Sequence, residues 1–209
     1  NGIDDNCNGM VDEAVRVYTF TDDVNGAPSM VSAHATAANL AVVNTAKTAA
    51  SSCPTGFSAK NFPAVTTYSS SLPAVEFVIT PASGYHIEAT SFSVDLRRNS
   101  TGQALIRFAY STDGGTNWID EGIDHSLLNA SCGIMTSFNW DFPDFLSLQP
   151  LKFRIYAFNA SATGGVLQIL NIGFNGKVCT AILDFDNDGY NAAVDCNENN
   201  AAIHPNAIE

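Results

Sequence analysis

The chain has 209 residues, of which 45% are hydrophobic, and a formal net charge of −12 at pH 7. This apolar share is enough for a folded core, and no apolar run approaches the roughly 18 residues that a membrane-spanning helix needs. The short apolar runs argue against membrane insertion. The negative charge argues against nucleic acid and anionic membrane surfaces, because phosphate-rich partners need lysine and arginine, and it favours cations as small partners.

The acidic residues are concentrated at the two ends of the chain. Residues 1–13 and 184–209 hold ten of the 21 carboxylates and none of the nine lysines and arginines, whereas residues 14–183 carry eleven acids and nine bases. We therefore expect an N-terminal acidic calcium-binding loop at 1–13, a β-sandwich domain at 14–183 and a C-terminal calcium-binding segment, similar to an EF-hand loop, at 184–209.

The N-terminal segment reads NGIDDNCNGMVDE. Oxygen-bearing side chains alternate along it, and Gly9 allows the sharp turn that brings alternate oxygens toward one point. It is a shortened version of a calcium loop, because its closing acids come early. The expected ligands are the side chains of Asp4, Asn6, Asn8, Asp12 and Glu13 and the backbone carbonyl of Met10.

The middle of the chain favours strands over helices. Segments rich in Val, Ile, Phe and Tyr are bounded by Gly, Pro, Asn or Ser, which is typical of short antiparallel strands. Helical periodicity is weak, although the Ala-rich stretch 27–50 has room for a helical turn. The fold class we predict is all-β, an antiparallel sandwich that resembles a jelly roll. The predicted strands are 15–20, 74–80, 86–98, 104–111, 151–160 and 166–176.

The segment STDGGTNW, residues 111–118, resembles an Asp-box hairpin. In such a turn Ser111 and Asp113 satisfy the local backbone and Trp118 packs beneath it. We expect a structural role for it. Trp118, Trp140 and Phe142 are also candidates for a sugar-stacking platform, but packing in the core and the hairpin is the favoured interpretation.

The C-terminal segment DFDNDGYNAAVD fits the spacing of a calcium loop. Side chains at positions one, three, five and twelve point inward, a glycine at position six makes the turn, and position seven offers its carbonyl. No lysine or arginine lies between residues 184 and 209, so a bound Ca²⁺ is the expected source of positive charge. The expected ligands are Asp184, Asp186, Asp188 and Asp195 through their side chains and Tyr190 through its carbonyl.

Two resemblances follow from these motifs. Placed after DCNENNAAIHPNAIE, the segment NGIDDNCNGMVDE resembles the MopE-type metal-binding repeats of bacterial surface proteins. In addition, SFSVDLRRNSTG, RFAYSTDGGTNW, FRIYAFNAS and LQILNIGFNG resemble a β-sandwich domain of large secreted Bacteroidetes proteins. The first resemblance implies units joined in tandem or in a filament, and neither implies catalysis.

Five cysteines occur without the spacing of a zinc site, so disulfides in an oxidising compartment are expected. Cys53 and Cys132 lie in loop-like stretches and form one predicted pair. The MopE resemblance implies a second pair, Cys7 with Cys196, at the joint. The odd count leaves one thiol free or paired across a chain boundary, and the connectivity of Cys179 stays open.

No nucleophile elbow, zinc-protease motif or P-loop is found, so an enzyme is not expected. The main hypothesis is a structural repeat unit of an extracellular bacterial filament or surface adhesin, with copies of itself as partners and calcium stiffening the joints. The alternative is a carbohydrate-binding module with structural calcium and glycans as partners.

Overall fold

The computed structural model describes residues 16–49, 55–128 and 135–180, together with 197, 199–200, 202–203 and 207. The described part of the chain contains fourteen strands and no helix, so none of it is a helix that could cross a membrane. The predicted antiparallel β-sandwich is confirmed. The strands are β1 Arg16–Thr21, β2 Met30–Val31, β3 Ala35–Ala37, β4 Ala41–Val43, β5 Ala46–Lys47, β6 Phe57–Lys60, β7 Ala74–Pro81, β8 Tyr85–Arg98, β9 Gln103–Ser111, β10 Ile119–Asp120, β11 His125–Ser126, β12 Thr136–Ser147, β13 Leu151–Ala160 and β14 Val166–Thr180.

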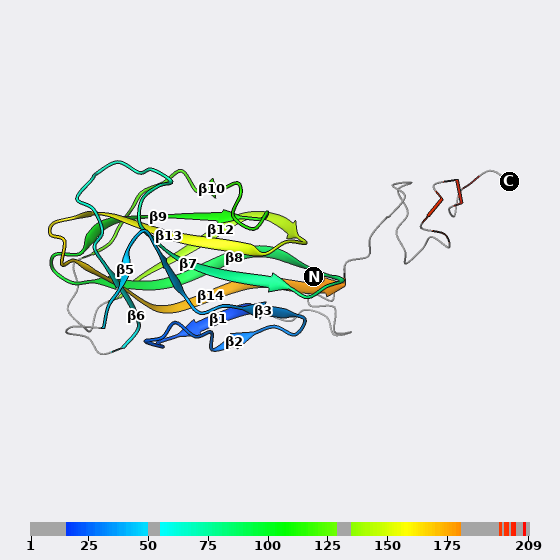
Figure 1. Cartoon of the computed structure of the whole chain (residues 1–209), viewed down its shortest axis with the longest axis horizontal. Coiled ribbons are helices and arrows are strands. Elements are labelled where there is room, and N and C mark those ends of the chain that lie inside the picture. The colour runs from blue at the N-terminus through cyan, green and yellow to red at the C-terminus, as the bar shows by residue number, and fades with distance from the viewer. Residues whose placement is uncertain are drawn as a thin grey trace.

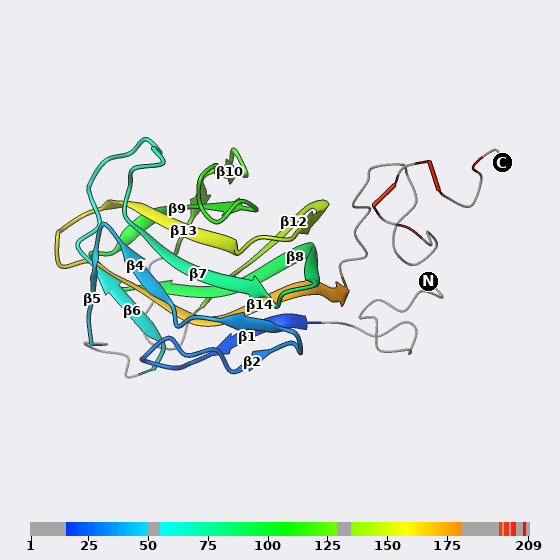
Figure 2. The same ribbon diagram turned by 45° about the vertical axis from the view of Figure 1, so that its right-hand side comes forward.

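The strands form two stacked sheets (Figures 1 and 2). Sheet A has the order β12-β8-β14-β1-β2, with β6 also on β14 and β5 on β6. Sheet B has the order β10-β9-β13-β7-β3, with β11 also on β9 and β4 on β7. The long strands from β7 to β9 and from β12 to β14 alternate between the sheets, which gives the fold its jelly-roll character.

Alternation along the strands builds the core between the sheets. In β13, Leu151, Phe153 and Ile155 are buried in the main core, while Lys152 and Arg154 are only partly buried on the outer face. The ring of Phe153 stacks on Phe77 of β7 with centroids 4.9 Å apart, and it also meets sheet A through Phe174 at 4.9 Å. Such aromatic contacts hold the two layers in one rigid body.

The Ala-rich stretch was predicted with room for a helical turn, and it instead forms short strands. Residues 30–31, 35–37, 41–43 and 46–47 pair with longer neighbours in both sheets. Their pairing partners decide their conformation, because alanine itself favours helix over strand.

Candidate functional site

The outer face of sheet A is a regular array of short polar side chains. Cross-strand register aligns them in three rows over β12, β8, β14 and β1. We call this surface the polar face. Its rows are Ser137–Asp95–Asn171–Thr21, Asn139–Ser93–Gly173–Thr19 and Asp141–Ser91–Asn175–Arg16.

Hydrogen bonds across the strands fix the orientation of these side chains. Asp95 accepts a hydrogen bond on each carboxylate oxygen, from Ser137 Oγ at 2.6 Å and from Asn171 Nδ2 at 2.8 Å. In the third row, Asn175 Nδ2 donates to Ser91 Oγ at 2.9 Å. Since both partners of each bond are held by rigid strands, the face presents its remaining donors and acceptors in fixed directions.

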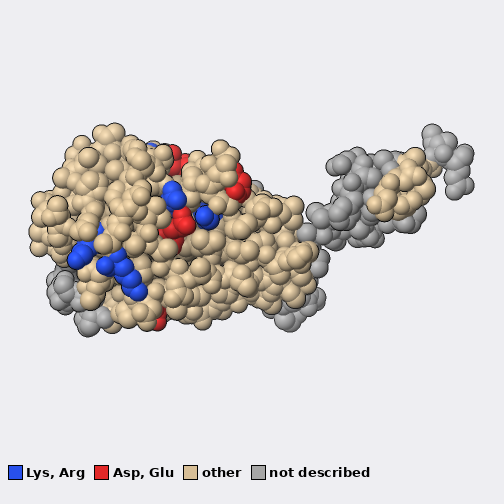
Figure 3. All heavy atoms as spheres, in the orientation of Figure 1, with Lys and Arg blue, Asp and Glu red and all other residues tan. Residues whose placement is uncertain are grey.

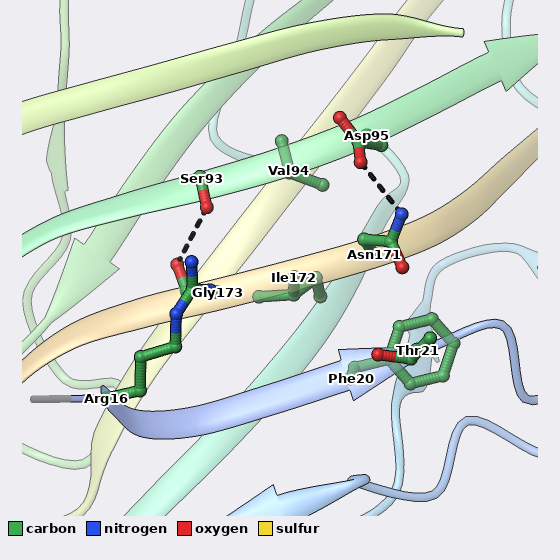
Figure 4. A pocket seen from close by; sticks show the side chains of 9 residues that line it. All are labelled: Arg16, Phe20, Thr21, Ser93, Val94, Asp95, Asn171, Ile172 and Gly173. Carbon is green, nitrogen blue, oxygen red and sulfur yellow. Dashed lines mark hydrogen bonds between the residues drawn. The ribbon is translucent and has the colours of Figure 1, made fainter.

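A hollow of about 270 Å³ lies on this face, between β1, β14 and β8 (Figure 4). Its volume is near the lower end of the roughly 300–1,000 Å³ range of small-molecule sites. The lining residues are Arg16, Phe20, Thr21, Ser93, Val94, Asp95, Asn171, Ile172 and Gly173.

Gly173 makes room for the cationic wall of this pocket. A Cβ at position 173 would overlap with the guanidinium of Arg16 and would meet Ser93 Oγ at 2.8 Å. The absence of a side chain therefore lets Arg16 extend over β14, as Figure 4 shows. The residue is a glycine because a side chain approaches its backbone closely, a role that glycine has in many strands.

The outer face of sheet B has a different construction, and we call it the covered face. Arg154 Nε binds Glu76 Oε2 at 2.9 Å, and its guanidinium lies 3.9 Å from the ring centroid of Trp118. Arg107 Nη2 likewise lies 2.7 Å from Asp124 Oδ1, and its guanidinium stacks over Tyr68 at 4.3 Å. Figure 3 shows acidic and basic side chains side by side in one group on the molecular surface. Each of these charges has an opposite charge beside it, so the covered face is a stabilising network.

The hairpin that carries Trp118 has the predicted Asp-box contacts. Asp113 accepts hydrogen bonds from the backbone N–H of Asn117 at 2.9 Å and from Ser111 Oγ at 2.7 Å. These bonds, the backbone bond first, lower the pKa of Asp113 below its usual value. Trp118 Nε1 donates to the carbonyl of Gly115 at 3.0 Å.

The aromatic candidates have packing roles. Trp118 lies beneath Arg154, Trp140 packs against the core beside Tyr110 at 5.5 Å, and Phe142 is buried. The rows of the polar face contain no aromatic side chain among the described residues. What this face offers to a ligand is therefore hydrogen-bonding groups and charge.

A cluster of His86, Glu88 and Cys179 lies where β8 begins and β14 ends. His86 Nε2 is 3.0 Å from Glu88 Oε1, and Lys177 Nζ is 3.1 Å from Glu88 Oε2. The three ligand-type atoms of the cluster lie within 4.8 Å of one another. Cys179, however, is disulfide-bonded, and metal binding by cysteine requires a thiolate. This cluster is therefore a contact of structural groups.

The predicted ligands and paired cysteines lie outside the described residues. These are Asp4, Asn6, Asn8, Met10, Asp12, Glu13, Asp184, Asp186, Asp188, Tyr190 and Asp195, together with Cys7, Cys53, Cys132 and Cys196. The predicted cysteine pairs stay predictions, and Cys179 itself is disulfide-bonded.

Sequence reasoning missed the polar face. Arg16, Asp95, Asn171 and Gly173 come from three strands that are far apart in the chain. The available signal was the alternation in SFSVD and LNIGFNG, which puts small polar residues on the side opposite the large apolar ones.

Comparison with known families confirms the resemblance at the two ends. The MopE-type metal-binding motif (Cu-binding_MopE) matches residues 1–13 and 195–209. No curated protein matches the chain.

Several solved structures resemble the chain at low sequence identity. The CBM22-1 xylan-binding domain of Paenibacillus barcinonensis Xyn10C is 8% identical, with 79% of this chain and 97% of that one covered and a TM-score of 0.41. The CBM22-1-GH10 modules of a Clostridium thermocellum xylanase are 16% identical, with coverage of 85% and 32% and a TM-score of 0.42. A family two carbohydrate esterase from Cellvibrio japonicus is 13% identical, with coverage of 72% and 36% and a TM-score of 0.36. The chain spans about a third of the latter two.

Proposed function

We propose that the chain is a non-enzymatic, extracellular glycan-binding module with metal-binding segments on both sides of its sandwich. The observation that carries the glycan-binding part is the pocket of the polar face, where fixed hydrogen-bonding groups surround a hollow of about 270 Å³. This was the alternative hypothesis from the sequence, and the geometry of sheet A is the reason to prefer it.

The chemistry of the polar face suits sugar hydroxyls. A hydroxyl both donates and accepts, and the face offers acceptors on Asp95, donors on Arg16 and both kinds on Asn171. Because the side chains are short and held by neighbouring strands, little conformational entropy is lost when a ligand binds. Each hydrogen bond contributes only about 0.5–1.5 kcal/mol net, so we expect weak binding, with Kd of roughly 10⁻⁵–10⁻³ M.

The test is glycan binding by the Asn171→Ala variant. Loss of its amide removes one ligand contact and the donor to Asp95, so we expect affinity for a bound oligosaccharide to fall about tenfold. The matched control is Asn25→Ala, an exposed asparagine outside the pocket, which should bind as the unchanged chain does. Equal affinity of both variants on a glycan array and in calorimetry would reject this site.

The metal in the terminal segments is proposed to be Ca²⁺. Alternating carboxylate and amide oxygens are hard ligands that suit calcium, whereas copper prefers imidazole or thiolate. Calorimetry should show Ca²⁺ binding with Kd of roughly 10⁻⁴–10⁻³ M, the range of extracellular modules. The paired substitution Asp184→Asn and Asp186→Asn should abolish the C-terminal site. Selective Cu²⁺ binding that survives this substitution would contradict the assignment.

A second candidate function is that of a repeat unit in an extracellular filament or adhesin, with copies of itself as partners. The motif match on both sides of the sandwich favours it, because metal sites there would stiffen the connections to neighbouring units. Small-angle scattering of two units joined in tandem should show a narrower distribution of distances with Ca²⁺ than with chelator. An unchanged distribution would reject metal-dependent stiffening.

A further inference from the structure

Arg16 differs from every other arginine in the described part of the chain. Four arginines donate to nearby acceptors within the sandwich, whereas Arg16 has no hydrogen bond or ion pair among the described residues and is exposed. The four bonds are Arg97 to Gln168 at 2.7 Å, Arg98 to the Leu127 carbonyl at 2.8 Å, Arg107 to Asp124 at 2.7 Å and Arg154 to Glu76 at 2.9 Å.

This guanidinium also lies directly beside the pocket. It lies over Gly173 at the wall of the pocket, where any side chain at position 173 would displace it. Arginine presents a planar fork of N–H donors that matches the two oxygens of a carboxylate or sulfate. Arg16 at the wall of the pocket can therefore bind one anionic group.

The opposite end of the pocket is suited to neutral hydroxyls. Asp95 and Asn171 lie one row away from Ser93 and Gly173, which is two residues along each strand, or about 7 Å. The carboxylate of Asp95 already accepts two hydrogen bonds but retains lone pairs for hydroxyl donors. A single sugar unit spans such a distance, with its anionic group near Arg16 and its hydroxyls near Asp95.

We propose that the pocket selects an anionic sugar, with Arg16 binding its carboxylate or sulfate and with Asp95 and Asn171 binding its hydroxyls. This inference rests on the proposed glycan-binding function and specifies the class of glycan. The net charge of −12 does not oppose it, because residues 14–183 are nearly balanced at eleven acids and nine bases. At moderate salt, repulsion from acids more than about 8–10 Å away is screened.

The experiment measures binding of three oligosaccharides by calorimetry: oligogalacturonate, a sulfated carrageenan fragment and neutral galacto-oligosaccharide. The unchanged chain should prefer at least one acidic ligand over the neutral one by about tenfold, and the preferred acidic ligand identifies carboxylate or sulfate. Arg16→Gln should lose this preference while its melting temperature stays unchanged. Arg16→Lys, which keeps the charge but loses the fork, should recover only part of it.

Lys47→Gln is the matched control, because it removes an equal charge from an exposed position away from the pocket. It should change affinity less than twofold. Equal affinity of Arg16→Gln and the unchanged chain for all three ligands would overturn the anionic preference. If a neutral ligand binds and its affinity depends on Asn171 but not on Arg16, the glycan-binding function stands and only the anionic preference fails. If no ligand binds, both fail.

Discussion

Charged side chains on the outer face of sheet B stand beside opposite charges, whereas on the outer face of sheet A the guanidinium of Arg16 stands at a pocket with no described partner. The covered face also stacks its arginines on Tyr68 and Trp118, while the polar face has no aromatic side chain in its rows. Two faces with the same strand geometry thus present different chemistry. Groups that are satisfied within the protein stabilise it, and groups that are left available can bind a ligand.

The largest expected effect is on the free energy of unfolding, which should depend on the arginines of the covered face but not on Arg16 of the polar face. Arg154→Ala removes the bond to Glu76 and the stacking on Trp118, so it should lower the free energy of unfolding by about 2–3 kcal/mol. Arg16→Ala should change it by less than about 0.5 kcal/mol, because Arg16 is exposed and has no partner among the described residues. Urea unfolding of both variants measures these changes. Equal losses of unfolding free energy in the two variants would contradict the difference between the two faces.

Glycan affinity, in contrast, should depend on the polar face. Gly173→Ala displaces the guanidinium of Arg16 and should weaken binding of the preferred glycan about tenfold, or 1.4 kcal/mol. Its free energy of unfolding should change by less than about 1 kcal/mol, because the displaced atoms belong to the ends of movable side chains. Gly164→Ala is the control, since its Cβ would meet nothing within 4 Å. Unchanged glycan affinity in Gly173→Ala would contradict the role of the glycine.

The interior gives a smaller contrast between two buried tyrosines. Burial raises the pKa of Tyr18, and its hydroxyl has no hydrogen-bond partner among the described residues. Tyr18→Phe should therefore raise the free energy of unfolding by about 1 kcal/mol. Tyr156 donates to the Ser70 carbonyl at 3.3 Å beneath the covered face, so Tyr156→Phe should lower it by about 0.5–1.5 kcal/mol. Calorimetry measures the melting temperature of both variants. A shift in the same direction for Tyr18→Phe and Tyr156→Phe would contradict the predicted difference.

The smallest effect concerns the exposed hairpin beside the covered face. The pKa of Asp113 is lowered, so its stabilising contribution is fully present above the usual pKa of 3.8 and is lost progressively as the pH falls through the lowered value. The difference in urea midpoint between the unchanged chain and Asp113→Asn should be constant from pH 5 to 7 and should shrink below pH 3.8. A difference that stays constant down to pH 2 would show that the charge contributes nothing.

Strands with strong alternation could be predicted from the sequence almost to the residue. The segment 151–160 was predicted as observed, and 74–80 falls one residue short of β7, because apolar residues alternate there between turn-forming neighbours. Strand β12 was missed, because Pro143 and its acidic neighbours are unusual within a strand. The short strands of the Ala-rich stretch depend on partners that local sequence does not reveal.

The candidate site was only partly visible in the local sequence, for a related reason. Asn171 points outward because the pairing of β14 with β8 shifts its register between Ile169 and Asn171. Such a bulge changes which residues share a face, and it is set by the partner strand. The two matched segments of the MopE-type motif, in contrast, are each a short continuous run of sequence, which is why the resemblance could be seen without a structure.

The irregular edge of sheet A has a consequence for the behaviour of the molecule in concentrated solution. Strand β12 is an outer strand, and its pairing with β8 shifts between Asp141 and Phe145, around Pro143. Proline offers no N–H, and the shift interrupts the row of backbone groups that a strand from a second molecule would need. Fibrillar growth by addition of a strand at this edge is thereby disfavoured when the molecule is concentrated.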